Sequence, residues 1–230
     1  MHDDPQPMVD GAPVAVAVDV LAELARGGRA LELGIGRGRI AIPLAARGVQ
    51  VHGIDISADE VAHLRAEPAG ASIPVTVGDF SSVRAEGTVS LAYVVFNTIM
   101  NLTSQASQVA CFRSVAAQLV PGGAFLIEVG VPSLRLLPPG ERYVVFDLSP
   151  GHWGIDEYDV ANQGLVSHHL EIRGGRAIQS SGPFRYVWPS ELDLMAELAG
   201  MRLESRWAGW RREPFTSESR QHVSVWRTPT

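Results

Sequence analysis

The chain has 230 residues, of which 46% are hydrophobic and 19% charged. It can therefore bury a core without disulfides or metals, and it is neither a disordered nor a fibrous sequence. The one cysteine, Cys111, excludes an internal disulfide and a cysteine-based zinc site, and it favours a reducing compartment. The formal net charge is −6, and the 19 basic residues form no basic stripe, which argues against nucleic acid as a partner.

All the basic residues are arginines, and lysine is absent from the sequence. This absence excludes the lysine of phosphate-binding loops, the lysine Schiff base of pyridoxal enzymes and the Tyr-x-x-x-Lys relay of many short-chain dehydrogenases. The start MHDDPQP is acidic, and Asp19 and Glu23 interrupt the apolar run 12–25. Neither segment fits a signal peptide or a membrane span, so we expect a cytoplasmic protein with no membrane partner.

Short apolar strands alternate with helices over the first 130 residues. The first helix is expected at 14–26, and the chain then continues with strands at 29–33, 49–55, 74–79, 89–96 and 123–130, separated by a helix ending near 47 and helices at 58–66 and 105–119. Helices between short strands are typical of βαβ crossovers. The pattern therefore predicts five parallel strands.

The pattern changes at residues 141–188, which alternate with the period of a strand and are divided by Pro-Gly, Asn-Gln-Gly and Gly-Gly turns. We expect an antiparallel lid here, inserted into a single domain of residues 1–230. A helix then begins at Pro189 and ends before Gly200. The last two strands, 201–210 and 220–227, are joined by a loop too short for a crossover helix, so they should pair antiparallel at one edge of the sheet.

Glu32 and three glycines form the motif Glu-x-Gly-x-Gly-x-Gly between a predicted strand and a helix. Gly34, Gly36 and Gly38 allow a sharp turn and a close approach of the backbone to a ligand, and the helix N-terminus that follows favours a carboxylate or phosphate. The dinucleotide fingerprint would require a glycine where this chain has Arg39. The spacing therefore argues against a nicotinamide cofactor.

Acidic residues end the next two predicted strands. Asp55 follows the first motif glycine by about twenty residues, the position from which an acid can accept hydrogen bonds from ribose hydroxyls. Capping of the next helix is its alternative role, for which Ser57 is better placed. Asp79 offers an acceptor for an adenine amino group, and Phe80 offers a backbone or ring contact for the base. Phe80 is equally typical of a core residue.

The glycine motif, the two acidic strand ends and the segment LVPGGAFLIEV together resemble the class I S-adenosylmethionine-dependent methyltransferase family over nearly the whole chain. The resemblance implies an α/β fold, a Rossmann-like seven-stranded sheet with five parallel strands and an antiparallel edge strand, flanked by helices and carrying the lid. It also implies S-adenosyl-L-methionine as cofactor. Its methionine part would contact Gly34, Gly36, Gly38, Glu32 and Asn97, its ribose Asp55, and its adenine Asp79, Phe80 and Ile56. Arg37 would either pair with the methionine carboxylate or point to solvent.

The acceptor of the methyl group is less determined. Residues 97–100, Asn-Thr-Ile-Met, lack the Asn/Asp-Pro-Pro-Tyr/Phe motif that marks amino-methylating enzymes of nucleic acids. With the acidic charge, this favours a small-molecule acceptor, such as a natural product, a sugar or an amino-acid-like compound, methylated on O, N or C. If the acceptor must lose a proton, the lid offers Tyr143, His152, Tyr158, His168 and His169 as candidate bases, of which we select His168, His152 and Tyr143. His168 and His169 are adjacent on a strand, so at most one of them faces a cleft.

The acidic run Asp156, Glu157 and Asp159 favours a solvated edge, with steering of a cationic amine as the alternative. No spacing of His, Asp or Glu is typical of a metal site. Two other functions stay open, a protein that binds S-adenosylmethionine without methyl transfer, such as a regulatory or cyclase-type relative, and a nicotinamide-dependent oxidoreductase.

Overall fold

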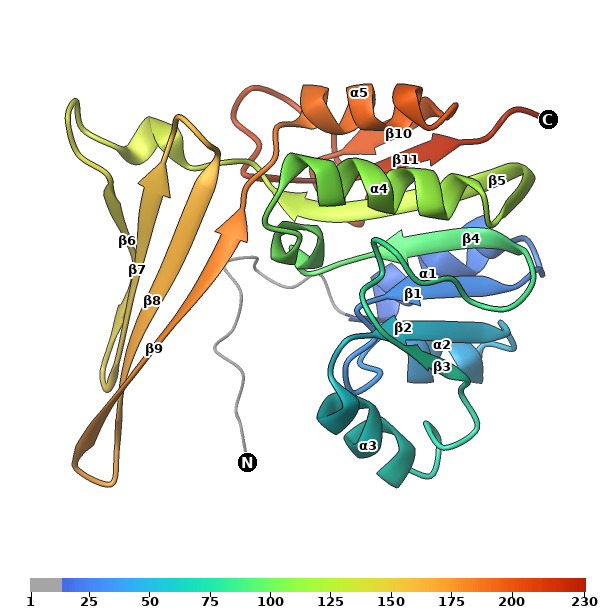
Figure 1. Cartoon of the computed structure of the whole chain (residues 1–230), viewed down its shortest axis with the longest axis horizontal. Helices are drawn as coiled ribbons and strands as arrows, with labels where there is room; N and C mark the ends of the chain where they lie inside the picture. Colours follow the sequence, from blue (N-terminus) through green and yellow to red (C-terminus); the bar gives the residue numbers. More distant parts are fainter. Residues whose placement is uncertain (1–13) are drawn as a thin grey trace.

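Two β-sheets make up the core of the computed structural model, which describes residues 14–230 (Figure 1). One sheet has seven strands in the order β10-β11-β5-β4-β1-β2-β3, and the other has four in the order β6-β7-β8-β9. The acidic start of the chain, and with it the beginning of the expected domain 1–230, lies outside the described residues. No helix within 14–230 combines the length and the apolar character needed to cross a membrane.

The first five strands pair in parallel, as the sequence predicts. They are β1 (Ala30–Leu33), β2 (Val51–Asp55), β3 (Val75–Val77), β4 (Val89–Val94) and β5 (Leu119–Gly130). The helix predicted at 105–119 is shorter in the structure, because α4 ends at Ala116 and β5 already begins at Leu119.

The last two strands, β10 (Arg202–Trp207) and β11 (Gln221–Arg227), pair antiparallel with each other at one edge of the sheet, as predicted. β11 also pairs antiparallel with β5. The reversed strand therefore lies one place inside the edge, and the edge strand β10 runs in the same direction as the first five. Burial explains this order, because the middle of β11 is fully buried whereas β10 is exposed or half-buried throughout.

Helices cover both faces of the seven-stranded sheet (Figure 1). On one face, α1 (Val14–Ala25), α2 (Ala41–Ala46) and Leu64 of α3 (Ala58–Ala66) share one hydrophobic cluster. On the other face, α4 (Gln105–Ala116) and α5 (Pro189–Leu198) share a second cluster with the 3₁₀ helix η1 (Thr98–Asn101). The side chain of Ser57 caps α3, as expected, by accepting a hydrogen bond from the Glu60 N–H at 3.2 Å.

The predicted hairpins form the second sheet, which we call the lid sheet. Its strands are β6 (Tyr143–Ser149), β7 (His152–Asp159), β8 (Gly164–Arg173) and β9 (Arg176–Arg185), and all neighbours pair antiparallel. In Figure 1 the arrowheads of β4 and β5 point toward this sheet. The lid sheet therefore stands at the carboxyl ends of the parallel strands, where open α/β sheets bind their ligands.

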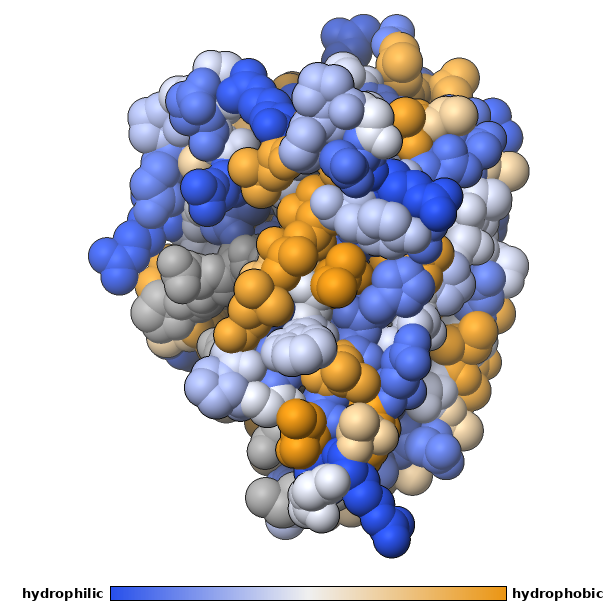
Figure 2. Space-filling view, turned by 90° about the vertical axis from the view of Figure 1, so that its left-hand side faces the viewer, coloured by the Kyte–Doolittle hydropathy of each residue, from blue (hydrophilic) through white to orange (hydrophobic). Residues whose placement is uncertain are grey.

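The two faces of the lid sheet differ in what they contact. On the face that we call the body face, Val144, Tyr158 and Leu165 cluster with Tyr186, and Met100 of η1 packs against them. The opposite, outer face exposes apolar side chains of β6 and β7. Figure 2 shows a band of apolar residues on this side of the molecule. The large exposed side chains of β6 and β7 on that face are Tyr143, Val145, Leu148 and Trp153.

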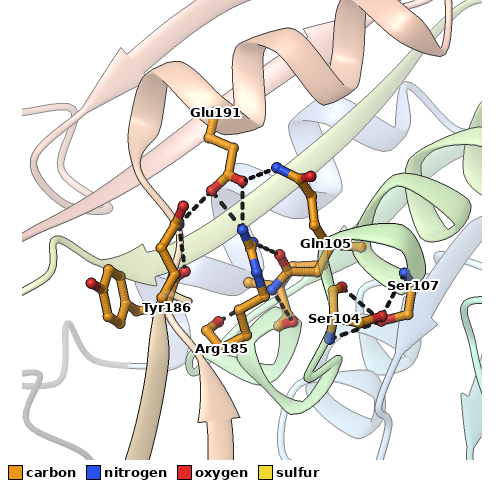
Figure 3. Close-up of polar contacts among 9 residues, drawn as sticks. Ser104, Gln105, Ser107, Arg185, Tyr186 and Glu191 are labelled. Carbon is orange, nitrogen blue, oxygen red and sulfur yellow. Dashed lines mark hydrogen bonds and ion pairs between the residues drawn. The ribbon is translucent and has the colours of Figure 1, made fainter. Parts of the chain in front are cut away.

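One buried ion pair joins the lid sheet to the helices (Figure 3). Arg185, the last residue of β9, places Nη2 2.7 Å from Oε1 of Glu191 in α5, and both side chains are largely buried. Gln105 of α4 and Gln163 donate to the same carboxylate at 2.9 and 2.7 Å. Burial alone would raise the pKa of Glu191, but the hydrogen bonds from Arg185 and the two amides bring it below its ordinary value. We call this set of contacts the clamp.

Candidate functional site

The three motif glycines all adopt left-handed backbone angles, with φ of +74°, +51° and +81° at Gly34, Gly36 and Gly38. They differ in their surroundings. A Cβ at Gly34 would lie 2.5 Å from the Thr98 side chain, and one at Gly38 would lie 2.5 Å from Leu64. A Cβ at Gly36 would meet no atom within 4 Å. Gly34 and Gly38 are therefore required by packing within the chain, and Gly36 borders open space that a ligand can fill.

Asp55 ties this loop to the end of β2. Its buried carboxylate accepts hydrogen bonds from the backbone N–H groups of Gly36 at 2.7 Å and Ser57 at 2.8 Å. A carboxylate can accept about four hydrogen bonds, so capacity for ligand hydroxyls remains. The next side chain, Ile56, is 73% exposed. An exposed isoleucine beside an anchored carboxylate suits an apolar, planar ligand group flanked by hydroxyls.

Asp79 and Phe80 follow β3 but have different environments. Asp79 accepts a hydrogen bond from the Ser81 N–H at 2.8 Å, which stabilises the turn. Phe80 is buried within the cluster beneath α4 and α5. The structure thus favours the core interpretation of the Phe80 ring, and a contact of this residue with a base would involve its backbone.

Glu32 lies beneath the glycine loop and is almost completely buried. Its carboxylate accepts a hydrogen bond from the Tyr93 hydroxyl at 2.9 Å. Burial raises the pKa of Glu32 to about 8, although this hydrogen bond and one from the Ala41 N–H at the start of α2 oppose the shift. Glu32 therefore connects β1, β4 and α2 below the loop, and its contact with the cofactor stays a prediction.

Arg37 takes up an arrangement that was not among the two expected for it. Its guanidinium pairs with the carboxylate of Glu60 in α3 at 2.9 and 3.2 Å. The side chain thus joins the glycine loop to α3. This ion pair is half exposed and is worth at most about 1 kcal/mol by general experience with surface pairs.

The residues after β4 have a strained backbone. Phe96 and Asn97 both have positive φ, 55° and 61°, a rare conformation for residues other than glycine that is often found at functional sites. Asn97 Oδ1 accepts a hydrogen bond from the Gly130 N–H at 2.6 Å. Glu128 accepts from the Phe96 N–H at 3.1 Å and from Trp210 Nε1 at 2.7 Å. The Asn97 side chain therefore joins the ends of β4 and β5, and its role toward a cofactor stays a prediction.

The lid sheet divides the candidate bases between its two faces. His168 lies on the outer face, with its ring nitrogens 2.8 Å from Ser181 Oγ and 3.3 Å from Glu157. The Tyr143 hydroxyl donates to the same Glu157 at 3.4 Å. We correct the expectation for His168 and Tyr143, because both side chains point away from the face that contacts η1. His168 and His169 do face opposite sides, as the strand period requires.

A polar chain that the sequence did not reveal lies on the body face. Asp147 Oδ2 is 2.7 Å from His152 Nδ1, His152 Nε2 is 3.0 Å from His169 Nδ1, and His169 Nε2 is 3.2 Å from Ser167 Oγ. Asp156 is opposite Ser167 in the register of β7 and β8. Of these residues, the sequence offers His152 and His169 as candidate bases. Strand alternation could have grouped His152 and Asp156, but the cross-strand partners depend on the register.

Asp156 also corrects the interpretation of the acidic run. Asp159 is exposed, as a solvated edge requires, but Asp156 is buried, with only 4% of the residue surface accessible to solvent. Burial raises the pKa of Asp156 to about 6, opposed by a hydrogen bond from Ser167 and by the charge of His168. Within residues 14–230, no group of three or more His, Cys, Asp or Glu side chains is placed to hold a metal ion.

Comparison with known proteins identifies the family of this arrangement. The profile of a family described as a methyltransferase domain matches residues 30–123. The solved structure of the CcbJ methyltransferase from Streptomyces caelestis superimposes on this chain with a TM-score of 0.88. The two sequences are 33% identical, and the match covers 99% of this chain and 94% of the CcbJ chain. The chain belongs to the class I S-adenosylmethionine-dependent methyltransferase family. The methyltransferase is thus an enzyme with S-adenosylmethionine as its methyl donor, which sets aside both alternative functions.

Two further proteins are similar to the methyltransferase. The cypemycin N-terminal methyltransferase of a Streptomyces species is 26% identical over 204 residues, which cover 86% of this chain and 82% of that protein. The structure of CalS10 with bound S-adenosylmethionine, an amino pentose methyltransferase from Micromonospora echinaspora, is 17% identical, with a TM-score of 0.69 and coverage of 93% and 89%. At 17% sequence identity, the similarity to CalS10 concerns the fold alone.

The residues at the carboxyl ends of β1 and β2 fit S-adenosylmethionine. Open space at Gly36 admits a ligand against the backbone, Asp55 offers carboxylate oxygens as acceptors, and Ile56 offers an apolar surface. When bound, the cofactor supplies a methyl group activated by a positively charged sulfur. The surrounding protein has mainly to align the reacting atoms and to exclude water.

Proposed function

We propose that the methyltransferase methylates an amine nitrogen of a small-molecule acceptor, and that the lid sheet covers this acceptor. The observation that carries the proposal is the buried carboxylate of Asp156 on the body face. Of the acceptors that the sequence left open, an amine is the one that is itself cationic and must lose a proton before it can attack. A buried acidic group suits both requirements, because it pairs with a cation and can accept its proton.

The name of one relative supports an amine as acceptor. The cypemycin N-terminal methyltransferase is named for an N-terminus, and an unmodified N-terminus is an amine. The net charge of −6 at pH 7 agrees with a cationic acceptor and with the absence of nucleic acid as a partner. Cys111 is buried and forms no disulfide, which suits the cytoplasm that we propose as its location.

In the donor half, we propose that the open side of Gly36 receives the methionine part of the cofactor, that Asp55 binds the ribose and that Ile56 packs on the adenine. The other cofactor contacts that we propose come from Glu32, Gly34, Arg37, Gly38, Asp79, Phe80 and Asn97. The acceptor would enter between this half and the lid sheet, residues 141–188.

Methyl transfer from radiolabelled S-adenosylmethionine to a panel of simple acceptors tests the proposal. The amines are alanine amide, proline amide and glucosamine, and the matched hydroxyl compounds are lactamide and glucose. We expect label in at least one amine and in neither hydroxyl compound, with mass spectrometry locating the methyl group on nitrogen. Absence of transfer to all amines between pH 6 and pH 10, conditions that span ordinary amine ionisation, contradicts an amine acceptor.

A further inference from the structure

We infer that Asp156 removes the proton from the acceptor amine, and that Ser167, His169 and His152 pass this proton to Asp147 at the surface of the lid sheet. The inference rests on the proposed amine methylation and adds the base and the route of the proton. Asp156 would touch the acceptor and is therefore a catalytic residue, whereas the other four residues act through it.

Asp156 occupies the right place for such a base. On β7 it lies two residues before Tyr158, on the same face, and Tyr158 belongs to the cluster against which Met100 of η1 packs. η1 follows directly after Asn97 at the carboxyl end of β4. Asp156 is thus on the part of the body face next to the ends of the parallel strands.

Within residues 14–230, the carboxylate of Asp156 forms no ion pair, and the positive charge that acts on it comes from His168, which points to the outer face. The described arginines that form ion pairs do so with other acids. A buried carboxylate without a positive partner is unfavourable, so an ammonium group placed beside it would be stabilised. With a pKa of about 6, Asp156 is ionised at neutral pH and able to accept a proton.

Asp147, the ionised end of this polar chain, sets the direction of the hydrogen bonds that link His152 and His169 to it. A hydrogen bond to His152 holds the pKa of Asp147 below its ordinary value, so Asp147 can only accept, and His152 Nδ1 must carry the proton. His152 Nε2 can then accept from His169 Nδ1–H, and His169 Nε2 can accept from the Ser167 hydroxyl. While Asp156 is ionised, the Ser167 hydroxyl donates to its carboxylate. Once Asp156 carries the proton, the hydroxyl turns to His169 Nε2 and a lone pair of Ser167 accepts from Asp156.

This polarity suits a proton that enters at Asp156 and leaves at Asp147. Asp147 is about one-third exposed, whereas His152 is 16% exposed at the side chain. Burial, followed by the charge of His152, lowers the pKa of His169, which keeps the ring neutral and able to relay. Each member passes one proton forward, and rotation of the Ser167 hydroxyl and exchange at the two rings restore the starting state.

The chemical step balances in atoms and charge. The acceptor ammonium gives one proton to the Asp156 carboxylate, and the freed lone pair of nitrogen forms the new N–C bond. The S–C bond of the donor breaks, and its electron pair stays on sulfur. The products are the methylated ammonium, S-adenosylhomocysteine and one proton, which leaves through the chain to water.

The test compares variants of neighbouring residues that point to opposite faces. Asp156→Asn removes the base and Glu157→Gln makes the same chemical change on the outer face. His169→Gln interrupts the relay and His168→Gln is its matched control. We expect Asp156→Asn to lower kcat for the methylated amine at pH 7 by about 100-fold or more, the usual contribution of a general base, and we expect both control variants to stay within about threefold of the parent.

The pH dependence separates loss of the base from general damage. In Asp156→Asn, kcat should rise about tenfold per pH unit up to the pKa of the amine, because only the unprotonated amine can then attack. His169→Gln should lose kcat without a change in KM, and added imidazole should restore part of it. The other titratable groups near Asp156 are Tyr158 and His152 on β7, His168 and His169 on β8, Asp147 on β6 and Tyr186 after β9.

Nuclear magnetic resonance of the ¹⁵N-histidine-labelled protein with bound S-adenosylhomocysteine gives a measurement independent of turnover. Asp156→Asn should shift the ring nitrogens of His169 and, through it, His152, and shift those of His168, which points to the opposite face, less. If Asp156→Asn fails to fold, His169→Gln supplies the kinetic test and its effect on His152 supplies the spectroscopic one.

The outcomes distinguish the two proposals. An amine that is methylated equally fast by the parent, Asp156→Asn and His169→Gln overturns the present inference and leaves amine methylation standing. Transfer to hydroxyl compounds alone overturns the proposed function and the inference with it. Unchanged histidine signals in Asp156→Asn overturn the relay even where the base is confirmed.

Discussion

Replacement of Gly36 by alanine tests the donor site most directly. The added Cβ meets no protein atom within 4 Å, so any effect on a ligand comes from the space that the methyl group takes. Gly36 has φ +51°, and an L-residue in the left-handed region costs about 1–2 kcal/mol. For a domain of this size we expect the melting temperature to fall by roughly 2–8 °C.

Gly48 provides a matched control, because it has φ +86° and a Cβ there would also meet nothing within 4 Å. It lies in the turn between α2 and β2, at the amino end of β2 and away from the carboxyl ends of the parallel strands. Gly36→Ala and Gly48→Ala should therefore lose similar stability. Calorimetric titration with S-adenosylhomocysteine should show at least a tenfold weaker dissociation constant for Gly36→Ala, or about 1.4 kcal/mol, and an unchanged one for Gly48→Ala. Equal affinities in the two folded variants would refute the placement of the cofactor beside Gly36.

Four other changes probe the donor site, the buried groups and the lid sheet. Asp55→Asn places an amide where two N–H groups need acceptors, so calorimetry should show S-adenosylhomocysteine binding at least tenfold weaker, and thermal melting a loss of about 1–3 kcal/mol; unchanged binding would contradict the ribose assignment. Glu32 keeps its proton in the folded state up to about pH 8, whereas the unfolded chain loses it near 4.5. Stability should thus fall as pH rises through this window, and urea unfolding of Glu32→Gln should lack this part of the slope. Arg185→Met leaves Glu191 buried without its cation and should lower the free energy of unfolding, measured in urea, by about 3–5 kcal/mol. A loss below about 1 kcal/mol would show that the two amide groups are enough to stabilise the buried carboxylate. Replacement of residues 141–188 by a short Gly-Ser bridge should leave S-adenosylhomocysteine binding within a few-fold and abolish methyl transfer; retained transfer would assign the lid sheet a purely structural role.

The sequence predicted the sheet and the lid because hydrophobic period and turn residues are local signals. Five parallel strands and four hairpin strands followed from them. The order of β10 and β11 did not follow, because it depends on which strand is buried against β5. The same holds for Arg37, whose partner Glu60 lies in the next helix but one.

The candidate site shows the same division between local and distant information. The glycine motif revealed the loop, but only the tertiary contacts of Thr98 and Leu64 show that Gly34 and Gly38 are needed for packing. The candidate bases were identified by residue type, which ignores the face of the strand. The register of β7 with β8 then placed Asp156 beside Ser167 and removed His168 from the body face.

On the proposal that the lid sheet covers the acceptor, the clamp bears on how lids can be exchanged between such enzymes. Arg185 closes the lid sheet at the point where the chain enters α5, and its partner Glu191 also holds Gln105 of α4 (Figure 3). A lid transplanted from another methyltransferase would therefore need an arginine at the end of its last strand, in register with this glutamate. Grafts joined within the strand before Arg185 keep the native ion pair, whereas grafts joined beyond it must supply their own. The clamp thus marks the natural junction for building chimeric methyltransferases with new acceptors.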